Sequence, residues 1–234
     1  MYGRRIDGRE IHLEPSGGLL HATIVMQDDE TDSYWFLMSD SCLSGEYRGT
    51  TLERLPAGVK IPFGEWRALH PETTVLEEYG ESWKPEDIYA DFFSSPRGFR
   101  GAEAADDRLE TKDPVYAFRM GGVPYAVPFA AFEGGAVFDV EGTEVFLYRE
   151  AGWPIRRSSL AYTGGIYAVL DGEWGHFPSA LGFRRGVGFP RGGASPPAPL
   201  TGMDTFWFNW SMSWPETKVL TEGIEGRKRT SAPR

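Results

Sequence analysis

Residues 115–127 read VYAFRMGGVPYAV, two short apolar runs joined by a pair of glycines. Val, Tyr and Phe favour β-strands, and a two-glycine loop is a common connection between antiparallel strands. Residues 136–148 repeat this pattern around a Glu-Gly pair, and residues 166–170 form another short apolar run that ends at Asp-Gly. The sequence therefore predicts a mainly β protein with antiparallel strands.

A further hairpin is expected near the N-terminus. Residues 11–13 and 19–26 are rich in Ile, Leu and Val, and the run PSGG at residues 15–18 lies between them. Because Pro, Ser and Gly are typical turn residues, we expect the turn at this run. A few short helices are expected over residues 65–69, 85–93, 128–132 and 205–213.

The composition limits the classes of function. Among 234 residues, 24 Lys and Arg stand against 34 Asp and Glu, which gives a net charge of −10. Because this charge repels phosphate groups, we expect neither nucleic acid nor a membrane surface as a partner. The sequence has no apolar run long enough to span a membrane and no apolar signal segment at its start. A cytoplasmic location is therefore expected, although a longer natural N-terminus could carry a targeting signal.

An internal repeat is the strongest pattern in the sequence. Trp66 and Trp210 are each followed, five residues later, by Pro-Glu-Thr-x-Val-Leu, at an offset of 144 residues. Six of the eleven positions are identical, which favours duplication of one supersecondary unit. We expect a single domain made of two related halves, followed by a flexible basic tail. Its parts are a shortened first repeat (1–76), a connector (77–114), a second repeat (115–220) and the tail (221–234).

The two halves differ in length. The second half begins with two expected hairpins between residues 115 and 148, whereas the first half has only residues 1–13 in that place. Either the first repeat lost these strands, or the chain begins partway through a longer ancestor. A sheet edge exposed by the loss would be a pairing surface, so a homodimer through that edge is one expectation.

Several segments together resemble a known family. They contain a Ser-Gly-Gly-Leu-Leu stretch, an Asp-x-Glu-Thr turn, a Gly-x-x-x-Gly-Thr-x-Leu-x-x-Leu-Pro stretch and a Trp-x4-Pro-x-Thr-x-Val-Leu close. The segments are residues 7–35, 43–58, 66–76 and 107–132. Over about residues 3–220 the chain resembles the bacterial and archaeal domain-of-unknown-function family 3179.

The resemblance implies an architecture but no chemistry, because the family has no established reaction. Its members commonly carry a Cys-Pro-x-Cys segment before the point at which this chain begins, and this chain has no counterpart, so no role of that cysteine pair carries over. The chain also has Ala126-Val127-Pro128 where Ala-Tyr-Pro is usual in the family.

His70 is the strongest candidate for a catalytic residue. It follows Trp66 by four residues, so the two side chains would share one face of a short helix, and histidine titrates near neutrality. Glu72, and Asp139 from the second half, could supply carboxylates. In the repeat, however, His70 aligns with Trp214, so a packing role is the alternative.

The tryptophans divide into two groups. Trp207, Trp210 and Trp214 have the spacing of one helical face, which favours a place in the core. Tryptophans in turn-rich surroundings are harder to bury and are therefore the better candidates for a surface that binds a planar ligand. The candidate ligand-binding residues are Trp83, Trp153, Trp174 and Trp66.

No cofactor and no metal site is expected. His12 and His21 would lie on neighbouring strands, but no His spacing typical of a metal site supports them. The acidic residues 28–32 lack the spacing of a calcium loop, which favours a solvated turn. Cys42 is the single cysteine and has no neighbouring base, so a structural thiol is expected.

The resulting hypothesis is a binding module. A cleft between the halves, lined by aromatic side chains, would bind a small molecule or a partner peptide. The alternative is an enzyme of unknown class that uses His70 and nearby carboxylates.

Overall fold

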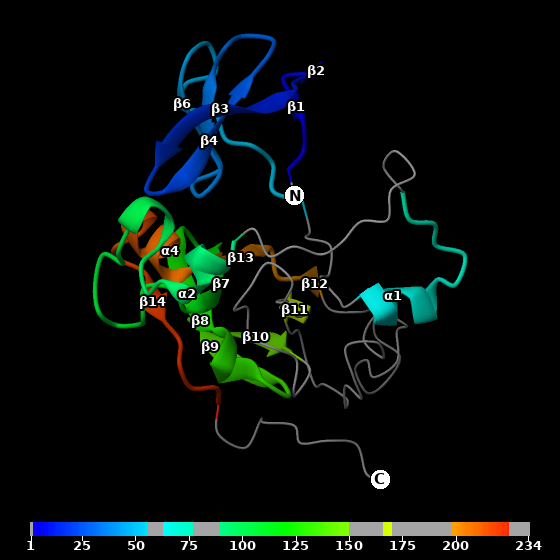
Figure 1. The fold of residues 1–234 in the computed structure, drawn as a ribbon, viewed down its shortest axis with the longest axis vertical. Helices are drawn as coiled ribbons and strands as arrows, with labels where there is room; N and C mark the ends of the chain where they lie inside the picture. The colour runs from blue at the N-terminus through cyan, green and yellow to red at the C-terminus, as the bar shows by residue number, and fades with distance from the viewer. Residues whose placement is uncertain (1, 56–62, 77–88, 150–165, 170–197, 225–234) are drawn as a thin grey trace. The chain divides into compact units, whose positions relative to one another are not determined.

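The computed structural model describes residues 2–55, 63–76, 89–149, 166–169 and 198–224 (Figure 1). Strands outnumber helices in this part of the chain, and most strands pair antiparallel, so the predicted mainly β class is confirmed. The chain divides into two compact units. Unit 1 comprises Met1–Gly58, Arg97–Pro128 and Pro199–Thr221, and unit 2 comprises Val59–Pro96, Phe129–Ala198 and Glu222–Arg234. The division into two repeats within one domain stays a prediction.

The N-terminal part of unit 1 is a small hairpin followed by a four-stranded antiparallel sheet. The strands are β1 (Arg5–Ile6), β2 (Arg9–Glu10), β3 (Leu13–Leu20), β4 (Thr23–Asp28), β5 (Tyr34–Phe36) and β6 (Ser41–Ser44). Trp35 is fully buried in a cluster beside this sheet, with Ile6, Ile11, Cys42, Tyr47 and Leu52. Its indole N–H donates to Asp28 Oδ2 at 2.7 Å.

The prediction of a turn at residues 15–18 is wrong. Strand β3 continues through this run with a bulge, because Ser16 Oγ donates to the Val25 carbonyl at 2.7 Å and keeps the chain beside β4. The turn lies instead at His21 and Ala22, whose φ angles of 49° and 55° match a tight two-residue hairpin turn. Such angles are unfavourable for residues other than glycine, and the Asn209 amide, 3.3 Å from both carbonyls, stabilises them.

A second sheet of unit 1 has the order β13-β7-β8-β14. Its strands are β7 (Pro114–Met120), β8 (Val123–Pro128), β13 (Gly202–Phe206) and β14 (Lys218–Val219), and β14 pairs parallel to β8. The helix α4 (Trp207–Ser213) packs on this sheet, and a short 3-10 turn, η1, covers Phe99–Gly101. The core that the two sheets share consists of Phe36, Met38, Val115, Ala117, Ala126, Trp207 and Trp210.

Unit 2 contains a sheet with the order β12-β11-β10-β9. Its strands are β9 (Ala136–Val140), β10 (Thr143–Tyr148), β11 (Ile166–Val169) and β12 (Ala198–Pro199). The unit also holds α1 (Phe63–Leu69), α2 (Ala90–Ser94) and the 3-10 turn η2 (Phe129–Phe132). The N–H of Ile224 donates to the Val137 carbonyl at 2.7 Å, which ties the first residues of the predicted tail to β9.

The hairpins predicted at residues 115–127 and 136–148 are confirmed as β7–β8 and β9–β10. The helices predicted at 65–69 and 205–213 correspond to α1 and α4. The run 128–132 forms a 3-10 turn rather than an α-helix, and residues 85–88 of the remaining predicted helix lie outside the described residues. Within the described ranges, no helix combines the length and the hydropathy that crossing a membrane requires.

Candidate functional site

The helix α1 and the turn after it bring together three residues that the sequence marked as candidates. The rings of Trp66 and His70 lie 4.2 Å apart between centroids, and the Trp66 indole N–H donates to Thr73 Oγ1 at 2.9 Å. The His70 N–H donates to the Trp66 carbonyl, and Thr73 N–H to the His70 carbonyl, at 2.9 and 3.0 Å. These bonds hold Glu72 beside His70, with 3.5 Å between Nδ1 and Oε1.

The His70–Glu72 pair is open to water. The two side chains are 45% and 76% exposed, so solvent screens the attraction between them. Asp139 does not join them: its carboxylate accepts the Gly142 N–H at 3.2 Å and thereby closes the β9–β10 turn. Of the three candidate catalytic residues, two are neighbours and the third stabilises a hairpin.

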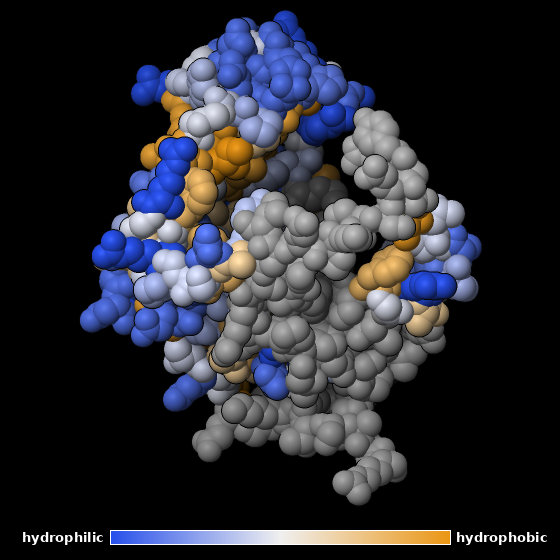
Figure 2. All heavy atoms as spheres, viewed as in Figure 1, coloured by the Kyte–Doolittle hydropathy of each residue, from blue (hydrophilic) through white to orange (hydrophobic). Residues whose placement is uncertain are grey.

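Large apolar side chains are exposed over the same stretch of chain. Phe63 is 53% exposed, Trp66 42%, Val75 68% and Leu76 98%. Figure 2 shows hydrophobic side chains on the surface at α1. We call these four residues, together with His70, the α1 surface.

The other candidate ligand-binding tryptophans, Trp83, Trp153 and Trp174, lie outside the described residues. The predicted core positions are confirmed for Trp207 and Trp210, which are both fully buried. Trp66, which corresponds to Trp210 in the repeat, is exposed instead.

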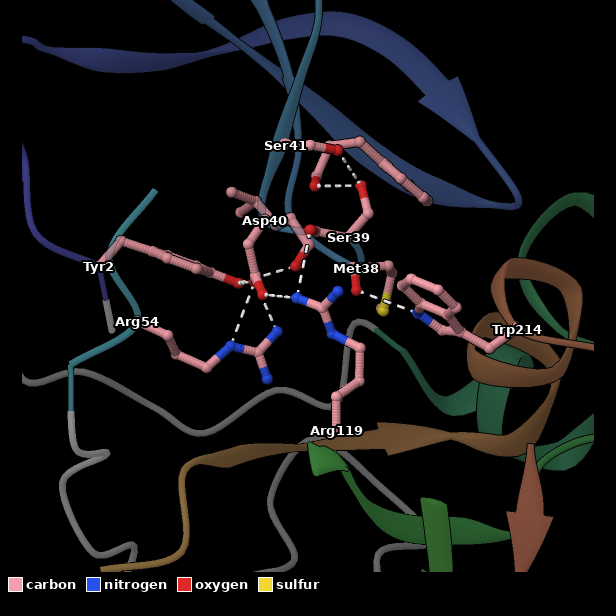
Figure 3. Close-up of polar contacts among 10 residues, drawn as sticks. Tyr2, Met38, Ser39, Asp40, Ser41, Arg54, Arg119 and Trp214 are labelled. Atoms are coloured by element: carbon pink, nitrogen blue, oxygen red, sulfur yellow. Dashed lines mark hydrogen bonds and ion pairs between the residues drawn. The ribbon is translucent and has the colours of Figure 1, made fainter. Parts of the chain in front are cut away.

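Sequence reasoning missed a buried polar cluster around Asp40 in unit 1. Figure 3 shows the side chains of Tyr2, Arg54 and Arg119 directed at its carboxylate. Arg54 donates to Oδ1 through Nε at 3.1 Å and Nη2 at 2.5 Å, and Arg119 Nη2 donates to Oδ2 at 2.6 Å. The Tyr2 hydroxyl lies 2.7 Å from Oδ1. We call these four residues the Asp40 network.

The network links segments that are far apart in the sequence. Burial, above all, raises the pKa of Tyr2 well above its ordinary value of 10.0, so the phenol stays protonated. The Arg119 guanidinium also lies over the Trp214 ring at 5.0 Å, and the Trp214 indole N–H donates to the Met38 carbonyl at 3.2 Å. Asp40 has a positive φ of 61°, which Asp tolerates better than most residues.

Comparison with known proteins identifies the family. The family model described as "Protein of unknown function (DUF3179)" matches residues 1–217. The chain belongs to this family. No curated protein and no solved structure matches it. The matched range includes the α1 surface and the Asp40 network, but the family description assigns no activity to either.

The histidines of the N-terminal sheet of this DUF3179 protein have separate partners. His12 Nδ1 lies 2.6 Å from Glu30 Oε1, and His21 Nδ1 lies 3.3 Å from Ser213 Oγ. Across the described ranges, no group of three or more His, Cys, Asp or Glu side chains has the arrangement of a metal site. The predicted solvated acidic turn needs correction at Asp28, which is fully buried and accepts the Trp35 indole N–H.

Cys42 is 4% exposed, and its thiol donates to the Ser44 carbonyl at 3.2 Å. Burial raises the pKa of this thiol, which disfavours the nucleophilic thiolate. Both observations support the structural role predicted for it.

The His12–Glu30 pair predicts a pH dependence. The Glu30 hydrogen bond raises the pKa of His12 above its ordinary 6.5, and the same bond lowers the pKa of Glu30 below 4.5. The His12 contribution to stability is therefore complete below pH 6.5 and lost as the pH rises through the higher folded pKa. The Glu30 contribution is complete above pH 4.5 and lost as the pH falls through the lower folded pKa, so the pair is strongest between these values.

An NMR titration of the His12 ring measures this directly. In Glu30→Gln the midpoint should fall toward the ordinary value, whereas Asp29→Asn, which changes a neighbouring exposed acid, should leave it in place. An unchanged midpoint in Glu30→Gln would contradict the assignment.

Proposed function

We propose that the protein is a partner-binding module and that the α1 surface contacts a protein partner. The observation that carries the proposal is the exposure of Phe63, Trp66, Val75 and Leu76 within fourteen residues of chain. Transfer of a large apolar side chain out of water contributes about 1.5–3 kcal/mol, so covering these residues would drive association.

Charge indicates the chemistry of the partner. Glu72 lies within the turn after α1, and the following sequence adds Glu77, Glu78 and Glu81 with no Lys or Arg up to residue 83. A partner with basic residues on both sides of an apolar core would match this stretch in charge and in hydropathy.

An enzyme centred on His70 is less well supported. A general base needs a fixed orientation, which burial and hydrogen bonding provide. The His70 and Glu72 side chains are 45% and 76% exposed, and the distance between Nδ1 and Oε1 is 3.5 Å, so this contact orients the imidazole weakly. The tilted packing of the Trp66 ring against the His70 ring is compatible with a contact surface as well as with a catalytic site.

A displayed library of random 16-residue peptides tests the proposal. Selection on the wild-type protein should enrich peptides with an apolar core and Lys or Arg on both sides. Fluorescence anisotropy with the enriched peptides should show at least about tenfold weaker binding to Trp66→Ala and to Leu76→Asp.

The matched control is Leu19→Ala, because Leu19 is also an exposed apolar residue, 39% exposed, but lies on β3. This variant should bind the peptides as the wild type does. Failure to enrich any peptide, or equal binding to all variants, would contradict the proposed function.

A further inference from the structure

The two halves of the chain contain the same local structure at α1 and α4. Each helix has seven residues, and both ends lie at an offset of 144. In the second half the Trp214 N–H donates to the Trp210 carbonyl at 2.8 Å, and Thr217 N–H to the Trp214 carbonyl at 3.1 Å. These bonds correspond, position by position, to those that His70 and Thr73 make after α1.

In the second half, the segment that follows the helix and turn pairs with a strand of the same chain. Directly after its Pro-Glu-Thr turn, β14 pairs parallel with β8, with Lys218 opposite Tyr125 and Val219 opposite Ala126. The Leu220 N–H then donates to the Ala126 carbonyl at 2.9 Å. Trp210 is buried in the same core as Ala126, and Val219 packs against that core.

In the first half the corresponding positions are uncovered. Thr74 and Val75 correspond to the two residues of β14, but they form no strand with any described residue. Val75 is 68% exposed and Leu76 98%, and the tryptophan of this unit, Trp66, is 42% exposed. The unit therefore presents a strand-forming segment and an aromatic side chain without the strand that covers them in the second half.

From this correspondence we infer that residues 74–76 pair, in parallel, with an extended apolar strand supplied by a partner protein. The inference rests on the proposed function and specifies how the partner is bound. Leu76 N–H, which corresponds to Leu220 N–H, donates to a carbonyl of the partner strand, and Val75 and Trp66 pack on its side chains.

The chemistry of the partner strand follows from β8 and from the local charge. Tyr125, Ala126 and Val127 of β8 are all buried, so the partner strand is apolar on both faces. Glu72 and the glutamates that follow the segment in the sequence, at positions 77, 78 and 81, favour basic residues beside that strand. Each strand in the described part of the chain already pairs with at least one other strand, and we assign the partner strand to a separate polypeptide.

The test uses a fluorescently labelled peptide with the sequence of residues 113–129, which contains β7 and β8, extended by two lysines at each end. We expect saturable binding to the full chain in fluorescence anisotropy. Leu76→Pro removes the N–H but keeps an extended backbone, whereas Leu76→Ala removes most of the side chain and keeps the N–H. Because one hydrogen bond separates them, Leu76→Pro should bind about five- to tenfold more weakly than Leu76→Ala.

Hydrogen exchange gives an independent readout, because strand pairing protects the Leu76 amide and side-chain docking does not. Circular dichroism checks that both variants fold, which the exposure of Leu76 leads us to expect. Equal binding of the two variants, with no protection of the Leu76 amide, would overturn strand pairing. If Trp66→Ala still weakened binding of the peptide in that case, the proposed function would stand.

Two other outcomes are decisive. A peptide that does not bind would overturn the strand inference, while the library selection decides the proposed function by itself. Concentration-dependent dimerisation that Leu76→Pro abolishes would show that a second copy of the chain is the occupant, and would overturn the separate partner.

Discussion

Replacing Asp40 by Asn is expected to lower the free energy of unfolding by about 3 kcal/mol or more, because removal of one partner leaves buried charges uncompensated. The Asp40 side chain is 6% exposed, and those of Arg54 and Arg119 are 12% and 31% exposed. Water therefore compensates little for the loss of the negative charge and of the hydrogen bonds that the carboxylate accepts. Asn has the same shape and also tolerates the positive φ of this position. The loss therefore reports on charge. Urea unfolding followed by tryptophan fluorescence measures it as a lower midpoint with an unchanged slope.

The matched control is Asp29→Asn, which removes a carboxylate from an exposed position. It should change stability by less than about 0.5 kcal/mol. A double-mutant cycle with Arg119→Met isolates the pair, because the cost of Asp40→Asn should shrink once Arg119 has no charge. A cost for Asp40→Asn no larger than for Asp29→Asn would show that the Asp40 network does not stabilise unit 1.

Replacing Trp210 by Ala is expected to cost about 3–5 kcal/mol, as for other large aromatic residues removed from a core. Trp210 is fully buried among Val115, Ala117 and Ala126, and the cavity would lie between α4 and its sheet. Its indole N–H has no acceptor among the described residues, so the loss is one of packing and not of a hydrogen bond. Thermal and urea unfolding both measure it.

The sequence repeat supplies the control for this variant. Trp66→Ala changes the corresponding residue of the first half, and its 42% exposure predicts a loss below about 1 kcal/mol. The two variants together separate the two roles of one motif, since Trp210→Ala should unfold the chain at a lower urea concentration and Trp66→Ala should weaken peptide binding. Equal destabilisation by both would refute the assignment of Trp66 to a binding surface.

The candidate site combines residues that are close in the sequence with residues that are far apart. His70, Glu72 and Trp66 are close in sequence, and the helix and turn that join them follow from local hydrogen bonds, so their proximity was predictable. Asp139 was selected for its residue type alone, and it stabilises a turn. The Asp40 network joins residues 2, 40, 54 and 119, and no spacing in the sequence relates these positions.

The sequence by itself determined the β class, the positions of two hairpins and of two helices, and the family. The hairpins and helices depend on local properties of a few residues, such as the φ preferences of Gly121-Gly122 and of Gly142 and the alternation of apolar side chains. The turn at His21 and Ala22 could not be predicted from the local sequence. Asn209, almost two hundred residues away, stabilises a conformation that His and Ala disfavour.

Only the tertiary structure decided which copy of the repeated motif is core and which is surface. Trp66 and Trp210 have the same neighbours in sequence and similar backbone hydrogen bonds, yet one is 42% exposed and the other fully buried. Burial depends on what packs against a side chain and not on the segment that carries it. In the second half β7 and β8 cover the motif, and the first half presents the same motif to solvent.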